Sequence, residues 1–199
     1  MSFHDLFFNS RWGYLLQVIP WMLLAAGVFW LLRGQWLKRR RLSRGGLLHE
    51  MGLLVFTCYL SGLLALVCTP ANFWSRLWYF LFYGRAGDEG DPLFSGSFNL
   101  VPTLLRYLTG EYTGGSWILF MYVGNTLLFL PFGLLLPAVC NVGLNKTLGL
   151  ALILSLGMEL FQPVVGRSFD TDDLITNLLG ALLGYLLFCI CKSVFQKRR

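Results

Sequence analysis

The chain has 199 residues, of which 56% are hydrophobic and 13% are charged, with a formal net charge of +6. Soluble domains carry about 25% charged residues, so this composition excludes an ordinary soluble protein and indicates a polytopic membrane protein. The positive balance does not indicate a nucleic-acid partner, because most of it falls beside predicted membrane spans. The five cysteines form neither paired CxxC motifs nor Cys–His pairs, so the sequence indicates no disulfide framework and no zinc site.

The apolar runs predict an all-α bundle of about five transmembrane helices in a single membrane domain, residues 1–199. The predicted spans are about 12–32, 47–68, 117–137, 146–162 and 173–191. Pro20 is expected to kink the first span, and Thr69-Pro70 to end the second. His49 and Glu50 are expected at a solvated helix end.

Basic residues concentrate between the first two predicted spans: Arg33, Lys38, Arg39, Arg40, Arg41 and Arg44. This run suits either a patch for anionic lipid or nucleic acid, or a cytoplasmic anchor that sets topology, and the pattern favours the anchor. With the run inside, 11 of the 16 Lys and Arg residues lie on the cytoplasmic side. The N-terminus is therefore predicted outside and the C-terminus in the cytoplasm.

A long outer loop is predicted over about residues 71–115. It begins with NFWSRLWYFLFYGR, which is too short to span a bilayer and whose aromatic composition favours a helix lying at the headgroup level. A second short helix is expected after Pro102. A loop this long in a small membrane protein is more typical of a functional segment than of a simple connection.

Two polar stripes meet at the turn between the last two predicted spans, and Arg167 lies in that turn. The first stripe is Ser155, Glu159 and Gln162; the second is Asp170, Asp173, Asn177, Gly180 and Gly184. An ionisable group in a bilayer costs roughly 2.5–3.5 kcal/mol on insertion scales, so such groups usually face a partner or a cavity. Asp172 points away from the stripe and is expected to be solvated.

Purely structural roles are an alternative for these residues. Asp170 and Asp173 could cap the last helix, Arg167 could neutralise Glu159, and Asn125 and Asn177 could join helices by hydrogen bonds.

The functional interpretation is a polar pocket facing outward. Carboxylates at the membrane boundary suit acid/base chemistry or oxygen coordination of Mg²⁺ or Ca²⁺; the sequence itself requires no cofactor. No histidine joins the cluster, which argues against zinc and against a Ser-His-Asp set.

Three motifs together resemble the VanZ-like family of bacterial membrane proteins over about residues 99–190. They are NLVP at Asn99–Pro102, GNTLLFLPFGLLLP at Gly124–Pro137, and E-x₂-Q-x₄-R-x₂-D-x₂-D-x₃-N-x₂-G from Glu159 to Gly180. The resemblance implies these signature polar positions: Asn99, Asn125, Glu159, Gln162, Arg167, Asp170, Asp173 and Asn177. It also implies helix-packing roles for Gly124, Gly133, Gly180 and Gly184.

The family's founding member is associated with resistance to teicoplanin, a lipid-tailed glycopeptide. One hypothesis is therefore a non-enzymatic protein of the bacterial cell envelope that binds a lipid-linked cell-wall precursor or lipoglycopeptide, or changes drug access, at the outward pocket. The alternative is an intramembrane enzyme that modifies a lipid or cell-wall precursor, with Glu159, Asp170 and Asp173 as acid/base groups or metal ligands. A channel or transporter is less favoured, because one polar cluster gives no continuous path across the membrane.

Overall fold

The computed structural model describes residues 16–40, 46–69, 73–84, 95–110 and 116–197. It confirms the all-α class. Its helices are α3 (Ile19–Arg40), α4 (Leu47–Cys68), α5 (Phe73–Tyr83), α6 (Thr103–Leu108), α7 (Ser116–Cys140), α8 (Leu144–Phe161) and α9 (Thr171–Lys197). A 3₁₀ turn, η1 (Gln162–Val165), and two short strands, β1 (Phe98–Asn99) and β2 (Phe169–Asp170), complete the described elements.

Four of the described helices are long and apolar enough to cross a membrane, over Leu47–Cys68, Ile118–Cys140, Leu144–Val165 and Thr171–Val194. They correspond to the last four predicted spans. The first predicted span, 12–32, corresponds to α3, which lies beside α4 and extends into the basic run; residues 12–15 lie outside the described part. Because the last turns of α3 carry Arg33, Lys38 and Arg39, a fifth crossing stays a prediction.

Prolines mark helix ends at two positions. The predicted kink at Pro20 is wrong, because Pro20 lies in the first turn of α3. Backbone N–H groups in the first turn have no acceptor within the helix, so a proline there breaks no helical hydrogen bond. The predicted end of the second span is right: α4 ends at Cys68, and Thr69 before Pro70 is extended, with φ −89° and ψ 130°.

Glycines allow α7 and α9 to pack with their backbones nearly touching. A Cβ on Gly133 would lie 1.9 Å from the Ala181 carbonyl oxygen, and one on Gly184 would lie 2.0 Å from that of Leu130. A Cβ on Gly180 would likewise lie 2.2 Å from the Thr126 carbonyl oxygen. The packing role expected for Gly124 is wrong, because a Cβ there would meet nothing within 4 Å.

The core lies between α4, α7, α8 and α9. Phe129 is fully buried there, and Phe56 and Met158 pack in the same cluster. The Tyr59 hydroxyl of α4 donates a hydrogen bond of 2.8 Å to the Leu128 carbonyl of α7. This hydrogen bond joins α4 to α7 within the apolar core.

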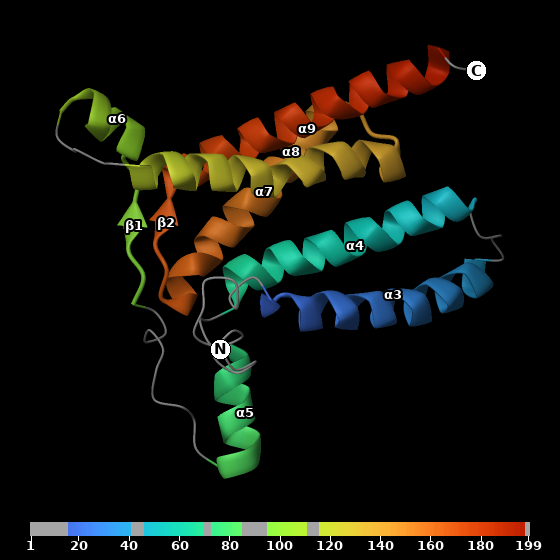
Figure 1. Cartoon of the computed structure of the whole chain (residues 1–199), viewed down its shortest axis with the longest axis horizontal. Helices are drawn as coiled ribbons and strands as arrows, with labels where there is room; N and C mark the ends of the chain where they lie inside the picture. The colour runs from blue at the N-terminus through green and yellow to red at the C-terminus, as the bar shows by residue number, and fades with distance from the viewer. Residues whose placement is uncertain (1–15, 41–45, 70–72, 85–94, 111–115, 198–199) are drawn as a thin grey trace.

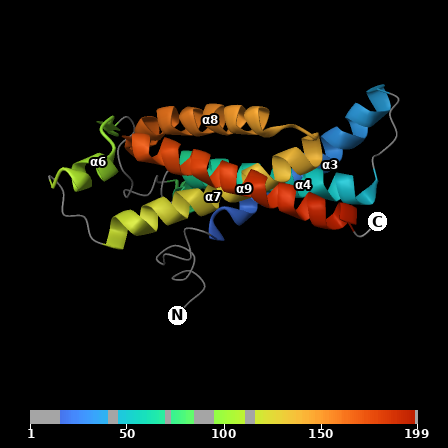
Figure 2. The same cartoon turned by 90° about the horizontal axis from the view of Figure 1, so that it is seen from above.

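The bundle has two chemically different ends (Figure 1). The end of α3, the starts of α4 and α8 and the end of α9 lie at one end, while α6, β1, β2 and the α8–α9 turn lie at the other. The view from above shows α7, α8 and α9 lying side by side (Figure 2). Helix α5 crosses the direction of the long helices, which is consistent with the expected headgroup-level helix; its position in a membrane stays a prediction.

One expectation at the basic end is wrong. Glu50 does not lie at a solvated helix end, because its two carboxylate oxygens accept hydrogen bonds of 3.1 and 2.8 Å from Nε and Nη2 of Arg33. The pair joins α3 to α4 near the start of α4.

Candidate functional site

Two strands bring the outer loop against the α8–α9 turn. Phe98 pairs with Phe169, and Asn99 with Asp170, in a parallel register. The Phe169 amide donates to the Ser97 carbonyl at 2.8 Å. Gly96 is needed for this approach, because a Cβ there would lie 1.9 Å from the Arg167 carbonyl oxygen. The pairing therefore joins two sequence motifs that are about 70 residues apart.

Glu159 lies buried at the centre of this junction, with 1% of its surface exposed. Its Oε1 accepts a hydrogen bond of 2.8 Å from Gln162, one turn along the chain. Its Oε2 accepts one of 2.9 Å from the backbone N–H of Asp170. Both carboxylate oxygens thus have protein donors, which stabilises a polar group away from water.

Asp170 caps the N-terminus of α9. Its Oδ1 accepts a 2.9 Å hydrogen bond from the Asp172 amide, which is the second residue of the helix. Its Oδ2 accepts one of 3.2 Å from the Asn99 side chain on β1. Burial raises the pKa of the Asp170 carboxyl above its usual value, although these two hydrogen bonds act in the opposite direction. The capping alternative is therefore right for Asp170.

The remaining predicted amides bridge helices. Asn125 of α7 donates to Oδ1 of Asp173 on α9, and Asn177 of α9 donates to the Ser155 hydroxyl of α8 at 2.9 Å. Asn177 is buried, and its side-chain oxygen has no hydrogen-bond partner among the described residues.

Arg167 lies at the edge of the cluster. Its side chain is exposed, and its Nη1 donates to the Leu66 carbonyl near the end of α4 at 3.2 Å. The hydrogen bonds of the predicted site residues thus form three groups: Asn99, Asp170, Glu159 and Gln162 in one, Asn125 with Asp173 in another, and Asn177 with Ser155 in the third. Arg167 lies where the turn meets α4. Among the described residues, no three His, Cys, Asp or Glu side chains group as ligands for a metal ion.

The expectation for Asp172 is wrong, because only 5% of it is exposed. Its Oδ1 accepts a 2.8 Å hydrogen bond from the Tyr122 hydroxyl of α7, and its Oδ2 accepts one from the Thr103 amide, the first residue of α6. The helical stripe correctly put Asp172 on another face of α9. Sequence periodicity could not show that α6 and α7 cover that face.

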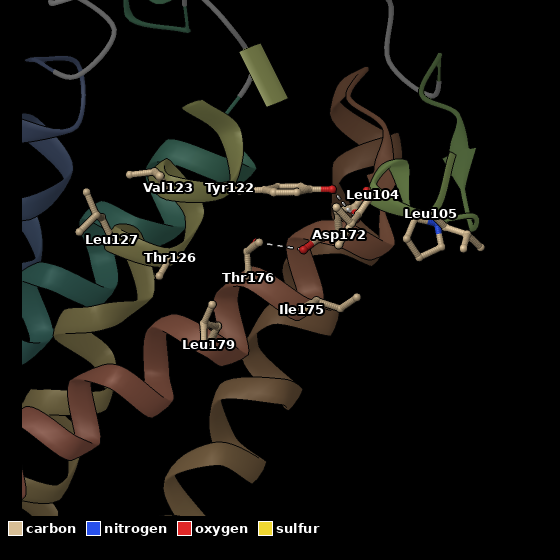
Figure 3. A pocket seen from close by; sticks show the side chains of 11 residues that line it. Leu104, Leu105, Tyr122, Val123, Thr126, Leu127, Asp172, Ile175, Thr176 and Leu179 are labelled. Atoms are coloured by element: carbon tan, nitrogen blue, oxygen red, sulfur yellow. Dashed lines mark hydrogen bonds between the residues drawn. The ribbon is translucent and has the colours of Figure 1, made fainter. Parts of the chain in front are cut away.

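A large apolar groove of about 710 Å³ lies beside Asp172, between α6, α7 and α9. Figure 3 shows the Tyr122 side chain directed from α7 toward Asp172, with Leu104 of α6 close to them. The rest of the lining is largely apolar, with half-exposed side chains that include Val123, Leu127, Ile175 and Leu179. Its volume falls within the range of about 300–1,000 Å³ that is typical of ligand sites.

The groove differs from the pocket that the sequence predicts. Among the predicted carboxylates, neither Glu159 nor Asp170 nor Asp173 lines it; Asp172 does. Tyr122 and Asp172 line the groove and are the functional candidates that the sequence did not identify, and the Thr103 amide helps to hold Asp172 in place. The signal available for them was the proximity of Thr103 to NLVP and of Asp172 to the acidic run.

Comparisons with known proteins give one family and one named relative. A family model described as VanZ/LLP1 matches residues 56–192, from within α4 to the last turns of α9. Protein VanZ of Enterococcus faecium is 31% identical over 80 residues, which are 39% of this chain and 49% of that protein. The match thus spans about half the length of this relative. No solved structure matches the chain.

Proposed function

Because this chain belongs to the VanZ/LLP1 family, we propose that it is a non-enzymatic protein of the bacterial cell envelope that binds a lipid-tailed ligand in the α6–α7–α9 groove. The ligand class comprises lipid-linked cell-wall precursors and lipoglycopeptides such as teicoplanin. Binding such a molecule at the outer face of the cell membrane would lower the access of the drug to its target and give low-level resistance.

The observation that carries this proposal is the groove itself. It combines an apolar wall about as large as a small-molecule site with a polar end, where Tyr122 and the Thr103 amide donate hydrogen bonds to the buried Asp172. An alkyl chain gains about 0.8 kcal/mol per CH₂ on leaving water, and a fixed groove would orient such a chain against the polar end. The placement of this end on the outer side rests on the predicted distribution of basic residues.

The intramembrane-enzyme hypothesis has weaker support. A catalytic base or acid needs access to a substrate proton, but Glu159 is 1% exposed and both of its oxygens accept hydrogen bonds from the protein. Asp170 likewise accepts bonds at both oxygens. These carboxylates stabilise the junction of the outer loop with α8 and α9, and this role accounts for their burial.

The proposal is tested by susceptibility measurements in a glycopeptide-susceptible bacterium that expresses the chain. We expect a higher inhibitory concentration for teicoplanin and no change for vancomycin, which lacks the lipid tail. Val123→Trp fills the groove and should abolish the effect. Leu119→Trp is the matched control, because Leu119 is also exposed on α7 but does not line the groove. Immunoblots of membranes confirm equal protein levels.

Full teicoplanin protection by the Val123→Trp variant, at equal protein level, would show that the groove does not bind the drug or its lipid-linked target. Equal protection against both drugs would show that the lipid tail is not what the protein recognises.

A further inference from the structure

Arg33 lies between two apolar grooves at the basic end of the bundle. The first groove, about 310 Å³, lies between α3 and α4 and includes Trp30, Leu47 and Leu54. The second, about 390 Å³, is lined mainly by α3 and includes Ala25, Leu32 and Trp36. Phe29 and Arg33 line both grooves. One basic residue, Arg33, therefore borders two apolar grooves.

The surroundings fix this guanidinium in place. Arg33 donates from Nε and Nη2 to the two oxygens of Glu50, and its side chain is 21% exposed. Its Cζ also lies 5.1 Å from the centre of the Trp36 ring. A bidentate pair is a geometrically specific contact, so Arg33 forms a rigid polar divider between the grooves.

Positive charge exceeds negative charge just beyond the divider. Lys38 and Arg39 follow on α3 and are both exposed. At about 1.5 Å per residue they lie roughly 8–9 Å nearer the basic end than Arg33. Within the described part of the chain, Glu50 is the one carboxylate at this end of the bundle, and Arg33 already neutralises it.

We propose that the α3–α4 hairpin binds an anionic phospholipid with two acyl chains, one chain in each groove. Arg33 separates the two chains, and Lys38 and Arg39 contact the phosphate at the headgroup level. Long basic side chains place their charge at that level while their stems cover apolar surface. A zwitterionic lipid would fill the grooves but would not compensate the excess positive charge, so the site selects anionic headgroups.

This lipid site is independent of the α6–α7–α9 groove, which lies at the opposite end of the bundle. The two sites share no lining residue, so failure of either proposal leaves the other unaffected.

The charge requirement is tested on the purified full chain, transferred from phosphatidylcholine nanodiscs that contain increasing phosphatidylglycerol. Native mass spectrometry counts the lipids retained. We expect preferential retention of phosphatidylglycerol, with about 30-fold weaker affinity in Lys38→Gln/Arg39→Gln, since each basic side chain near the surface contributes about a fivefold factor. The matched control is Lys146→Gln/Lys192→Gln, which removes two exposed basic residues at the same end from α8 and α9, helices that line neither of these two grooves, whereas Lys38 and Arg39 extend the α3 helix that lines both.

Equal weakening by both double variants would overturn the proposal, because it would show only general attraction to anionic membranes. Equal retention of phosphatidylcholine and phosphatidylglycerol by the unchanged chain would overturn it as well.

The groove requirement is tested with the charge unchanged. Ala25→Phe fills the second groove and should reduce phosphatidylglycerol retention, whereas Leu23→Phe, on an exposed α3 position outside both grooves, should not. Circular dichroism of both variants confirms helical folding. A folded Ala25→Phe variant with unchanged retention would refute the placement of an acyl chain in that groove.

Discussion

At the scale of single residues, Glu159 of α8 takes a capping role at the start of α9 that a side chain of α9 itself would normally take. In a capping box, the side chain at the third helical position accepts the N–H of the N-cap residue. In α9 that position is Asp173, but Asp173 instead contacts Asn125 of α7, and Glu159 of α8 accepts the Asp170 N–H. The start of α9 is therefore tied to two other helices at once.

The raised pKa of Asp170 gives a prediction about pH. Because burial favours the protonated form in the folded state, this group contributes stability below its unfolded pKa and loses that contribution as pH rises through its folded pKa. Asn caps helices about as well as Asp. Asp170→Asn should therefore gain stability relative to the unchanged chain as pH rises from below about 4, the ordinary aspartate value. Thermal unfolding midpoints in detergent between acidic and neutral pH test this.

Two observations would contradict that prediction. One is a pH-independent difference between the two proteins, and the other is a deficit in the Asp170→Asn variant that grows toward neutral pH.

At the scale of elements, the α7–α9 interface depends on the absence of side-chain atoms. Gly133, Gly180 and Gly184 each face a backbone carbonyl of the other helix at a distance that excludes a Cβ. Without a hydrophobic driving force between helices in lipid, such close packing is a main source of association.

A pair of glycine substitutions on α7 tests this interface. Gly133→Ala should destabilise the bundle by about 1–3 kcal/mol, because overpacking forces the two helices apart. Gly124→Ala should be neutral or stabilising by up to about 1 kcal/mol, because its Cβ meets open space and alanine favours the helix. Equilibrium unfolding in mixed micelles measures the free energy of unfolding of both variants. Equal losses of stability would show that close packing of α7 against α9 is not required.

At the scale of the whole molecule, the sequence predicts the long apolar helices but not which helices pack against one another. The bounds of α4, α7, α8 and α9 follow from the lengths of apolar runs and from breaks such as Thr69-Pro70. The polar cluster also follows, because helical periodicity places buried carboxylates on shared faces. The predictions for Asp172 and Gly124 were wrong because the surroundings of each residue depend on which helix covers its face. The spacing of residues along one helix does not show which other helix packs there.

The two ends of the bundle also predict membrane orientation. The structure places the basic ends of α3 and α9 opposite the candidate site, and positive residues favour the cytoplasm. In a chain without native cysteines, Arg106→Cys on α6 should react with an impermeant maleimide in intact cells. Gln196→Cys on α9 should react only after permeabilisation. The reverse labelling pattern would place the candidate site in the cytoplasm and remove the basis for drug binding there.

The parallel pairing of β1 with β2 constrains the order of biosynthesis. The ribosome completes residues 96–103 before it makes α7, α8 and α9, yet their partners lie at residues 163–172. Residues 96–103 therefore lack their protein hydrogen-bond partners until residues 163–172 have been made. Because α9 supplies one wall of the groove, a chain that stalls before α9 cannot form the groove at all.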